Sequence, residues 1–237
     1  LEAYLRFAHL SGARNFYVMG YNSRFSELSW EEIKQLNEFV AKSIKAMDNE
    51  SIVIVADPLH CSTSVSIDFA LHAQDIGADL ISLIFREKYY SDKQVVTHYT
   101  EIAKSASIDF LIHEMPFLSG FDGRNMEWPM SLIDEVTQID KVICIKEDSK
   151  NDDTTSEIIR RFKDRCQIVI SGGGKKRWMR FMDQGCQAWL NGIGVFEPRL
   201  AVRFWNAFKA GDFERMNVII ERVEELFFQK CVSQYGW

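Results

Sequence analysis

Seven short apolar runs recur along the chain, and a segment with helical periodicity follows each of them. The runs begin near residues 15, 51, 78, 110, 142, 167 and 188. Continuous apolar runs of this kind suit strands that are buried on both faces, which is typical of parallel sheets covered by helices. The alternation therefore predicts an α/β fold with a parallel sheet, either an open doubly wound sheet or a closed (β/α)8 TIM barrel.

The order of the segments favours the barrel. The units have a steady length, no linker divides the chain, and an amphipathic helical pattern at residues 1–10 precedes the first apolar run. In a barrel, a strand would come before that helix. We therefore expect a first strand before Leu1, and we expect residues to be missing at both ends of the chain.

Composition and charge narrow the class of protein. Of the 237 residues, 46% are hydrophobic and 26% are charged, which is typical of a soluble globular protein. The net charge of −6 and the absence of a basic cluster other than Lys175–Arg177 argue against a nucleic-acid partner. No apolar run has the length of a membrane span, and no secretory signal pattern opens the chain. The five cysteines are scattered without metal-ligand spacing, which predicts a reducing, cytoplasmic compartment.

The run Val142–Ile145 ends in a lysine, Lys146. An ammonium at the end of a buried strand loses its hydration, so it must be paired, neutralised or used in chemistry. One interpretation is an amine with a lowered pKa that attacks a carbonyl and forms a Schiff base. The alternative is a lysine at the rim, whose stem lies along the strand and whose head reaches water.

Strand alternation suggests a partner for this lysine. In a barrel, functional groups lie where strands end, and the polar residues at these ends lack the His and carboxylate density of a metal site. The period of two places Val142, Cys144 and Lys146 on one face, and Leu111 and His113 on one face of the neighbouring strand. If both faces point inward, Lys146 and His113 meet.

Several motifs along the chain resemble those of one family. In chain order, they are Gly20 before a polar turn, Ser62-Thr63, Gly77-Ala78-Asp79, Met115-Pro116, Ile145-Lys146-Glu147-Asp148-Ser149, Ser171-Gly172, Glu197-Pro198-Arg199 and Gly211-Asp212-Phe213. Together they resemble the dihydrodipicolinate synthase and N-acetylneuraminate lyase family of class I aldolases, and the resemblance covers nearly the whole chain.

The resemblance implies a fold and a reaction. It implies a (β/α)8 TIM barrel over residues 1–210, the start of a C-terminal helical extension over residues 211–237, and a homo-oligomer, either a dimer or a tetramer. It further implies that Lys146 forms a Schiff base with pyruvate or a related 2-oxo acid, with no cofactor. The expected activity is that of a lyase or aldolase acting on a 2-oxo acid or a sugar acid.

The residues around the lysine depart from the family pattern. Where the family has two hydroxyl residues this chain has Tyr21 and Asn22, and the arginine that binds the aldehyde substrate's carboxylate is Leu118. His113 stands where the family has the tyrosine that serves as acid and base, so the resemblance implies that role for His113. A buried neutral histidine bonded to the backbone is the alternative. Loss of the arginine argues against lysine biosynthesis, because a carboxylate then lacks a bidentate partner. The positions that the resemblance assigns to substrate binding are Tyr21, Asn22, Ser23, Arg86, Gly172 and Leu190.

Two further functions and one further site stay open at this point. The chain can be a sugar-acid dehydratase of the same family, or a 2-oxo-acid-binding barrel that has lost turnover. The glycines at 172–174, followed by Lys175 and Lys176, either cradle a phosphate at a helix start or form a tight turn before a solvated basic first turn.

Overall fold

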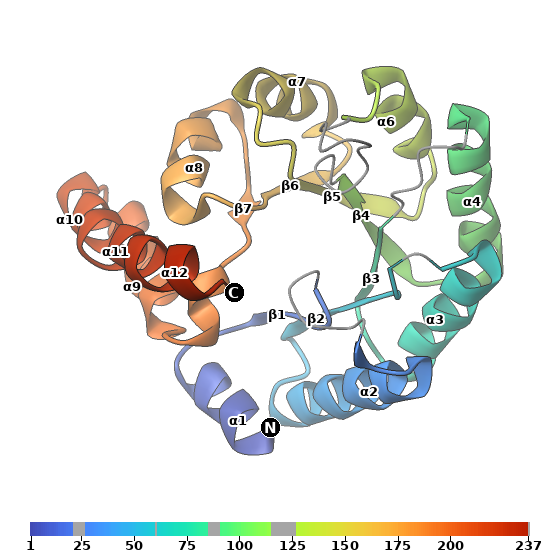
Figure 1. Ribbon diagram of the computed structural model, residues 1–237, viewed down its shortest axis with the longest axis horizontal. Helices are drawn as coiled ribbons and strands as arrows, with labels where there is room; N and C mark the ends of the chain where they lie inside the picture. The colour runs from blue at the N-terminus through green and yellow to red at the C-terminus, as the bar shows by residue number, and fades with distance from the viewer. Residues whose placement is uncertain (21–26, 60, 85–90, 115–126, 237) are drawn as a thin grey trace.

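The computed structural model describes residues 1–20, 27–59, 61–84, 91–114 and 127–236. Seven strands form one parallel sheet whose spatial order follows the chain. They are β1 (Asn15–Tyr17), β2 (Ile52–Ala56), β3 (Leu80–Leu83), β4 (Asp109–Glu114), β5 (Val142–Glu147), β6 (Gln167–Ile170) and β7 (Ala188–Trp189). The sheet curls, and the helices lie on its outside (Figure 1). The predicted α/β fold with a parallel sheet is confirmed, while closure by an eighth strand stays a prediction.

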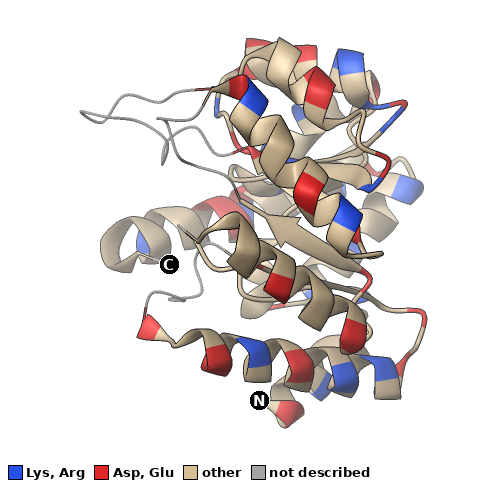
Figure 2. Ribbon diagram, turned by 90° about the vertical axis from the view of Figure 1, so that its right-hand side faces the viewer, with Lys and Arg blue, Asp and Glu red and all other residues tan. Residues whose placement is uncertain are grey.

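Helices follow the strands where the apolar periodicity predicts them. They are α1 (Glu2–Leu10), α2 (Trp30–Met47), α3 (Thr63–Asp75), α4 (Asp92–Ser105), α6 (Met130–Val136), α7 (Asp152–Phe162), α8 (Gly174–Phe181) and α9 (Arg199–Lys209). The start of α2 is fixed by a capping box, in which the Ser29 hydroxyl accepts from the Glu32 amide and the Glu32 carboxylate accepts from the Ser29 amide. On the side shown in Figure 2, acidic and basic residues are interspersed along the outer helices.

The strand register separates two faces of the sheet, because paired residues of parallel strands point to the same side. The outer face carries Val53, Ile81, Phe110, Ile112 and Ile145, all buried in the core beneath the helices. A second set of pairs, which includes Ser82 with Leu111 and His113 with Lys146, shares the opposite, inner face. The curl therefore encloses a row of polar side chains.

One expectation about this inner face is wrong. A register shift lies between Phe110 and Leu111, so that Phe110 pairs with Val142 but Leu111 pairs with Cys144. The irregularity inserts Ile143 without a partner and moves Val142 to the outer face, where it joins the core. Cys144 and Lys146 keep the inner positions that the alternation predicts.

The last strand is short, and the C-terminal segment is helical. The apolar run that begins at residue 188 forms a strand of two residues, β7, and Gly192–Val195 form a 3-10 turn that buries Ile193. From Phe213 to Tyr235 the chain forms a continuous helical run with π-helical turns. Its parts are α10 (Phe213–Ile219), a π-turn at Ile220–Glu224, α11 (Glu225–Phe227), a π-turn at Phe228–Val232 and α12 (Ser233–Tyr235). No helix in the described ranges is long and apolar enough to cross a membrane.

A buried ion pair joins this C-terminal run to the start of α8. The Lys175 ammonium lies 2.9 Å from the Glu224 carboxylate and donates to the Asn191 side chain, and the Lys175 amide donates to the same carboxylate. Both side chains are buried. The Glu224 carboxylate therefore lies at the N-terminus of α8, where the helix dipole favours an anion. The tight turn expected before α8 is present, and Lys176 is exposed as expected. The expectation is wrong for Lys175, which is buried and paired and so is neither solvated nor free to bind a phosphate.

Lys175 and its neighbour Lys176 provide a matched test of burial. Lys176 pairs with Glu225 at the surface. We expect Lys175→Met to lower the free energy of unfolding by about 3 kcal/mol, because it leaves the buried Glu224 charge without a partner. Lys176→Met should change it by less than about 1 kcal/mol. Urea unfolding curves of both variants measure the difference, and equal effects would contradict this account.

Candidate active site

Lys146 lies near the end of β5 on the inner face of the sheet. It is 2% exposed. Burial lowers the pKa of its amine to about 7, and the positive charge of Lys150 adds to this effect. The rim interpretation, with the ammonium in water, is therefore wrong. A buried amine with this pKa has a substantial neutral, nucleophilic fraction at neutral pH.

His113 meets this lysine, as the strand alternation predicts. The Lys146 Nζ lies 2.8 Å from the His113 Nε2 and 3.3 Å from its Nδ1. The same Nε2 lies 3.1 Å from the Asp148 Oδ2, and all three side chains are buried. One ring nitrogen is thus within hydrogen-bonding distance of both an amine and a carboxylate. Such an arrangement can hold a proton or pass it between two groups.

Asp148 continues the polar contacts to the edge of the sheet. Its carboxylate forms an ion pair with Lys150, whose ammonium also donates to the Ser171 carbonyl at 2.8 Å. Burial lowers the pKa of Lys150 to about 8. The Lys150 side chain is nevertheless half-exposed. The segment just after β5 therefore supplies two further charged groups to the neighbourhood of Lys146.

Tyr17 and Ser82 add two hydroxyls to the inner face. Their oxygens are 2.8 Å apart, and the Lys146 Nζ lies 5.5 Å from the centre of the Tyr17 ring. Burial raises the pKa of Tyr17, so its hydroxyl stays protonated and can donate a hydrogen bond. Motif comparison overlooks this pair, since neither residue belongs to one of the motifs shared with the family. Their signal is a polar residue at an inward position of an otherwise apolar strand.

A second polar layer lies on the outer face behind the lysine. Glu114 and Glu147 are paired in register on β4 and β5, and both are buried. The Arg177 guanidinium from α8 lies 3.3 Å from Glu147 and donates to Thr155 and to the Ser171 carbonyl. Burial, together with the nearby Glu147 charge, raises the pKa of Glu114 to about 8. This layer helps fix the ends of the strands that carry His113 and Lys146.

The other residues predicted for substrate binding are placed only in part. Tyr21, Asn22, Ser23, Arg86 and Leu118 lie outside the described residues. Gly172 and Leu190 follow β6 and β7, at the sheet edge where Lys146 lies. Gly172 has a φ of +72°, and a Cβ there would collide with the Lys150 ammonium, so glycine is required while Lys150 keeps this position. Leu190 is half-buried and donates its amide to Ile170 at 2.8 Å.

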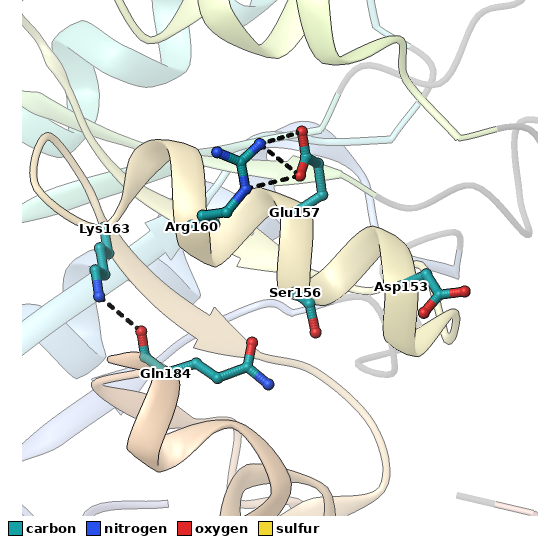
Figure 3. Close-up of a pocket in the computed structure, with 6 residues that line it drawn as sticks. All are labelled: Asp153, Ser156, Glu157, Arg160, Lys163 and Gln184. Carbon is teal, nitrogen blue, oxygen red and sulfur yellow. Dashed lines mark hydrogen bonds and ion pairs between the residues drawn. The ribbon is translucent and has the colours of Figure 1, made fainter.

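A hollow on the surface lies apart from these residues. It has a volume of about 310 Å³ and lies between α7 and the turn at Met182–Gln184. Its lining is polar, with Glu157 paired to Arg160 and Lys163 donating to the Gln184 carbonyl (Figure 3). None of the residues in contact with Lys146 lines it. Within the described ranges, no three His, Cys, Asp or Glu side chains are grouped so that they could hold a metal ion. All five cysteines are free.

Glu114 gives a test of this electrostatic description. An unfolded chain releases the glutamate proton near pH 4.3, whereas the folded protein holds it up to about pH 8. Between these values the folded state binds more protons, so the free energy of unfolding falls as the pH rises. We expect Glu114→Gln to remove this loss and to gain about 2–4 kcal/mol relative to the wild type between pH 5 and pH 9. Denaturant unfolding at several pH values measures it, with the exposed Glu101→Gln as the control that should follow the wild type.

Comparison with known proteins adds a family to this geometry. The model of the dihydrodipicolinate synthetase family matches residues 1–235. A 4-hydroxy-tetrahydrodipicolinate synthase of Methanosarcina barkeri is 25% identical over 198 residues, covering 82% of this chain and 62% of the relative. An uncharacterized DapA-like lyase of Pyrococcus abyssi is 24% identical over 228 residues, covering 90% of this chain and 69% of the relative. The chain thus spans only part of the length of these relatives.

Solved structures share the fold. CdNal from Clostridium difficile, solved in complex with mannosamine, has a TM-score of 0.80 at 17% identity, and the match covers 95% of this chain and 74% of that one. YagE, a prophage protein from E. coli K12 solved in complex with pyruvate, has a TM-score of 0.79 at 18% identity, with 95% of this chain and 75% of that one covered.

Proposed function

Because this chain belongs to the dihydrodipicolinate synthetase family, we propose that it is a lyase whose Lys146 forms a Schiff base with a 2-oxo acid such as pyruvate. The observation that carries the proposal is the buried Lys146 amine, which has a pKa of about 7 and lies 2.8 Å from His113. A neutral amine beside a proton carrier is what imine formation needs.

The proposed chemistry follows from these two groups. The neutral Lys146 amine attacks the carbonyl carbon, and loss of water gives an imine. The imine withdraws electrons, so an adjacent C–C bond can break while the enamine holds the electron pair. In this cleavage His113 takes the proton from the substrate hydroxyl and returns it to the enamine carbon. In dehydration, His113 instead takes a proton from the carbon next to the imine, and the enamine so formed expels the hydroxyl of the following carbon, which leaves as water with that proton. The Tyr17 and Ser82 hydroxyls share the inner face of the sheet with the amine. Protonation at the enamine carbon and hydrolysis of the imine release the product and restore Lys146.

The substrate class rests on relatives and on residues. Pyruvate is bound in the YagE structure, which supports a 2-oxo acid as the group that Lys146 takes. Tyr21, Asn22 and Ser23 are proposed to hold its carboxylate, and Gly172, Leu190 and Arg86 to contact the rest of the substrate. Leu118 in place of an arginine supports a function other than dihydrodipicolinate synthesis. A sugar acid is a second substrate class within the same chemistry.

The proposed fold, oligomeric state and location follow those of the family. We infer that the described sheet supplies seven strands of a (β/α)8 TIM barrel over residues 1–210, and that residues 211–237 begin a C-terminal helical extension. We also infer a cytoplasmic homo-oligomer, a dimer or tetramer, that works without a cofactor. Light scattering of the purified protein would test the oligomer.

Reductive trapping tests the proposed function. We expect incubation with pyruvate and borohydride to attach the reduced acid to Lys146, detected by peptide mass spectrometry. Lys146→Met should abolish the adduct, because no amine remains at this position. Lys141→Met, which removes a lysine just before the same strand, should leave the adduct in place. No adduct with any 2-oxo acid tried, together with ligand binding that persists in Lys146→Met, would favour the non-catalytic barrel instead.

His113 is expected to act on turnover rather than on capture of the substrate. His113→Gln keeps hydrogen-bonding capacity but cannot carry a proton at neutral pH. We expect trapped adduct to persist while turnover of a cleavable substrate, found by screening 2-oxo acids and sugar acids, falls about 100-fold or more. Unchanged turnover in this variant would show that another group moves the proton. Products of the same screen would separate aldol cleavage from dehydration.

A further inference from the structure

Lys150 has a backbone conformation that its side chain disfavours. Its φ is +60°, in the left-handed region where a Cβ crowds the following carbonyl and where glycine is the usual residue. Strained positions of this kind persist when the surrounding contacts hold them, and they cluster at functional sites. The strained backbone at Lys150 therefore indicates that contacts of its side chain hold the residue in this conformation.

The contacts of Lys150 lead to the candidate catalytic residues. Its ammonium is held between the Asp148 carboxylate and the Ser171 carbonyl, against Gly172. Asp148 in turn lies 3.1 Å from the His113 nitrogen that is 2.8 Å from the Lys146 amine. Four side chains thus form one line of polar contacts, with a positive group at the outer end and the proposed nucleophile at the inner end.

The negative charge of Asp148 and the positive charge of Lys150 have opposite effects on the protonation of Lys146. A buried carboxylate beside His113, taken alone, would stabilise an additional proton on His113 or Lys146. A protonated Lys146 cannot attack a carbonyl. A cation that pairs with Asp148 cancels this effect and also repels a proton on Lys146. Glu147 favours positive charge in the same region, and Glu114 does so only once it loses its proton near pH 8, whereas Arg177 from α8 opposes it.

We propose that Lys150 is a positioning residue of this site, whose ammonium acts as the counter-ion of Asp148 and so keeps the Lys146 amine unprotonated and ready to attack. The inference rests on the proposed imine chemistry, to which it adds the group that prepares the nucleophile. The lowered pKa of Lys146, to which the Lys150 charge contributes, agrees with it. With a pKa of about 8, Lys150 is mostly charged at pH 7 and half charged near pH 8. Just above pH 7, the larger fraction of the Lys146 amine is therefore neutral while the larger fraction of Lys150 is still charged.

The test measures the protonation midpoint of Lys146 in five variants and the wild type. Trace labelling with an amine-reactive reagent across pH, read on the Lys146 peptide by mass spectrometry, gives the midpoint without any 2-oxo acid. The variants are Lys150→Met, Lys150→Arg, Lys150→Gly, the double variant Asp148→Asn/Lys150→Met, and Lys141→Met as the control for loss of a distant lysine.

We expect Lys150→Met to raise the midpoint by at least about half a pH unit, and thereby to lower the rate of pyruvate trapping at pH 7 about twofold or more. Lys150→Arg should restore the wild-type midpoint, because it keeps the positive charge. The double variant should return toward the wild type, since it removes both charges. Lys141→Met should not move the midpoint.

Lys150→Gly separates function from folding. Both variants lose the ion pair with Asp148, but glycine adopts φ +60° without strain, so Lys150→Gly should unfold at a denaturant concentration no lower than Lys150→Met while its midpoint rises as in Lys150→Met. An unmoved Lys146 midpoint in both Lys150→Met and Lys150→Gly would overturn the inference, whether or not pyruvate is trapped. A wild type that traps no 2-oxo acid but shows the shifts would instead overturn the proposed function and leave the charge coupling standing.

Discussion

The site depends on one constraint, which is that an amine inside a curled parallel sheet has no water to hydrate its charge. Lys146 can remain there only if its amine is neutral or if neighbouring polar groups compensate for the lost hydration of its charge. His113 contacts the amine directly, and Asp148 and then Lys150 continue this line of contacts, while Tyr17 and Ser82 add neutral hydroxyls to the same face. The same loss of hydration that makes the position costly for an ammonium makes the neutral amine available for attack.

The sequence predicts the first contact of this site well and the later ones poorly. The period of two along β4 and β5 brings His113 to Lys146, because both residues lie inside strands whose geometry is regular. Asp148 and Lys150 follow the end of the strand, where no periodicity sets the direction of a side chain. The left-handed turn at Lys150 is still harder to predict, since a lysine gives no sign of it. The predicted face of Val142 is wrong for a related reason: the unpaired Ile143 reverses the face of the strand residue before it.

Long-range contacts account for the remaining differences. The sequence predicts that Lys175 is solvated in the first turn of a helix. In the structure it is buried against Glu224, which lies 49 positions later in the chain. Motif comparison assigns Gly172 to substrate binding, and the structure gives it a second reason to be glycine, since Lys150 packs against it. The ends of β4 and β5 and the segments after β5, β6 and β7 lie at one edge of the sheet, so the site combines residues that local patterns treat separately.

The central claim is that Lys146 is a neutral amine at physiological pH before any substrate arrives. It is tested most directly by an NMR titration of the lysine side chains, with the Lys146 signal assigned by its absence from Lys146→Met. The account predicts a midpoint near pH 7 for Lys146, well below the midpoint of about 10.4 that is usual for a lysine in water. A Lys146 midpoint above pH 10 would contradict it, because the amine would then be an ammonium wherever the protein is expected to act.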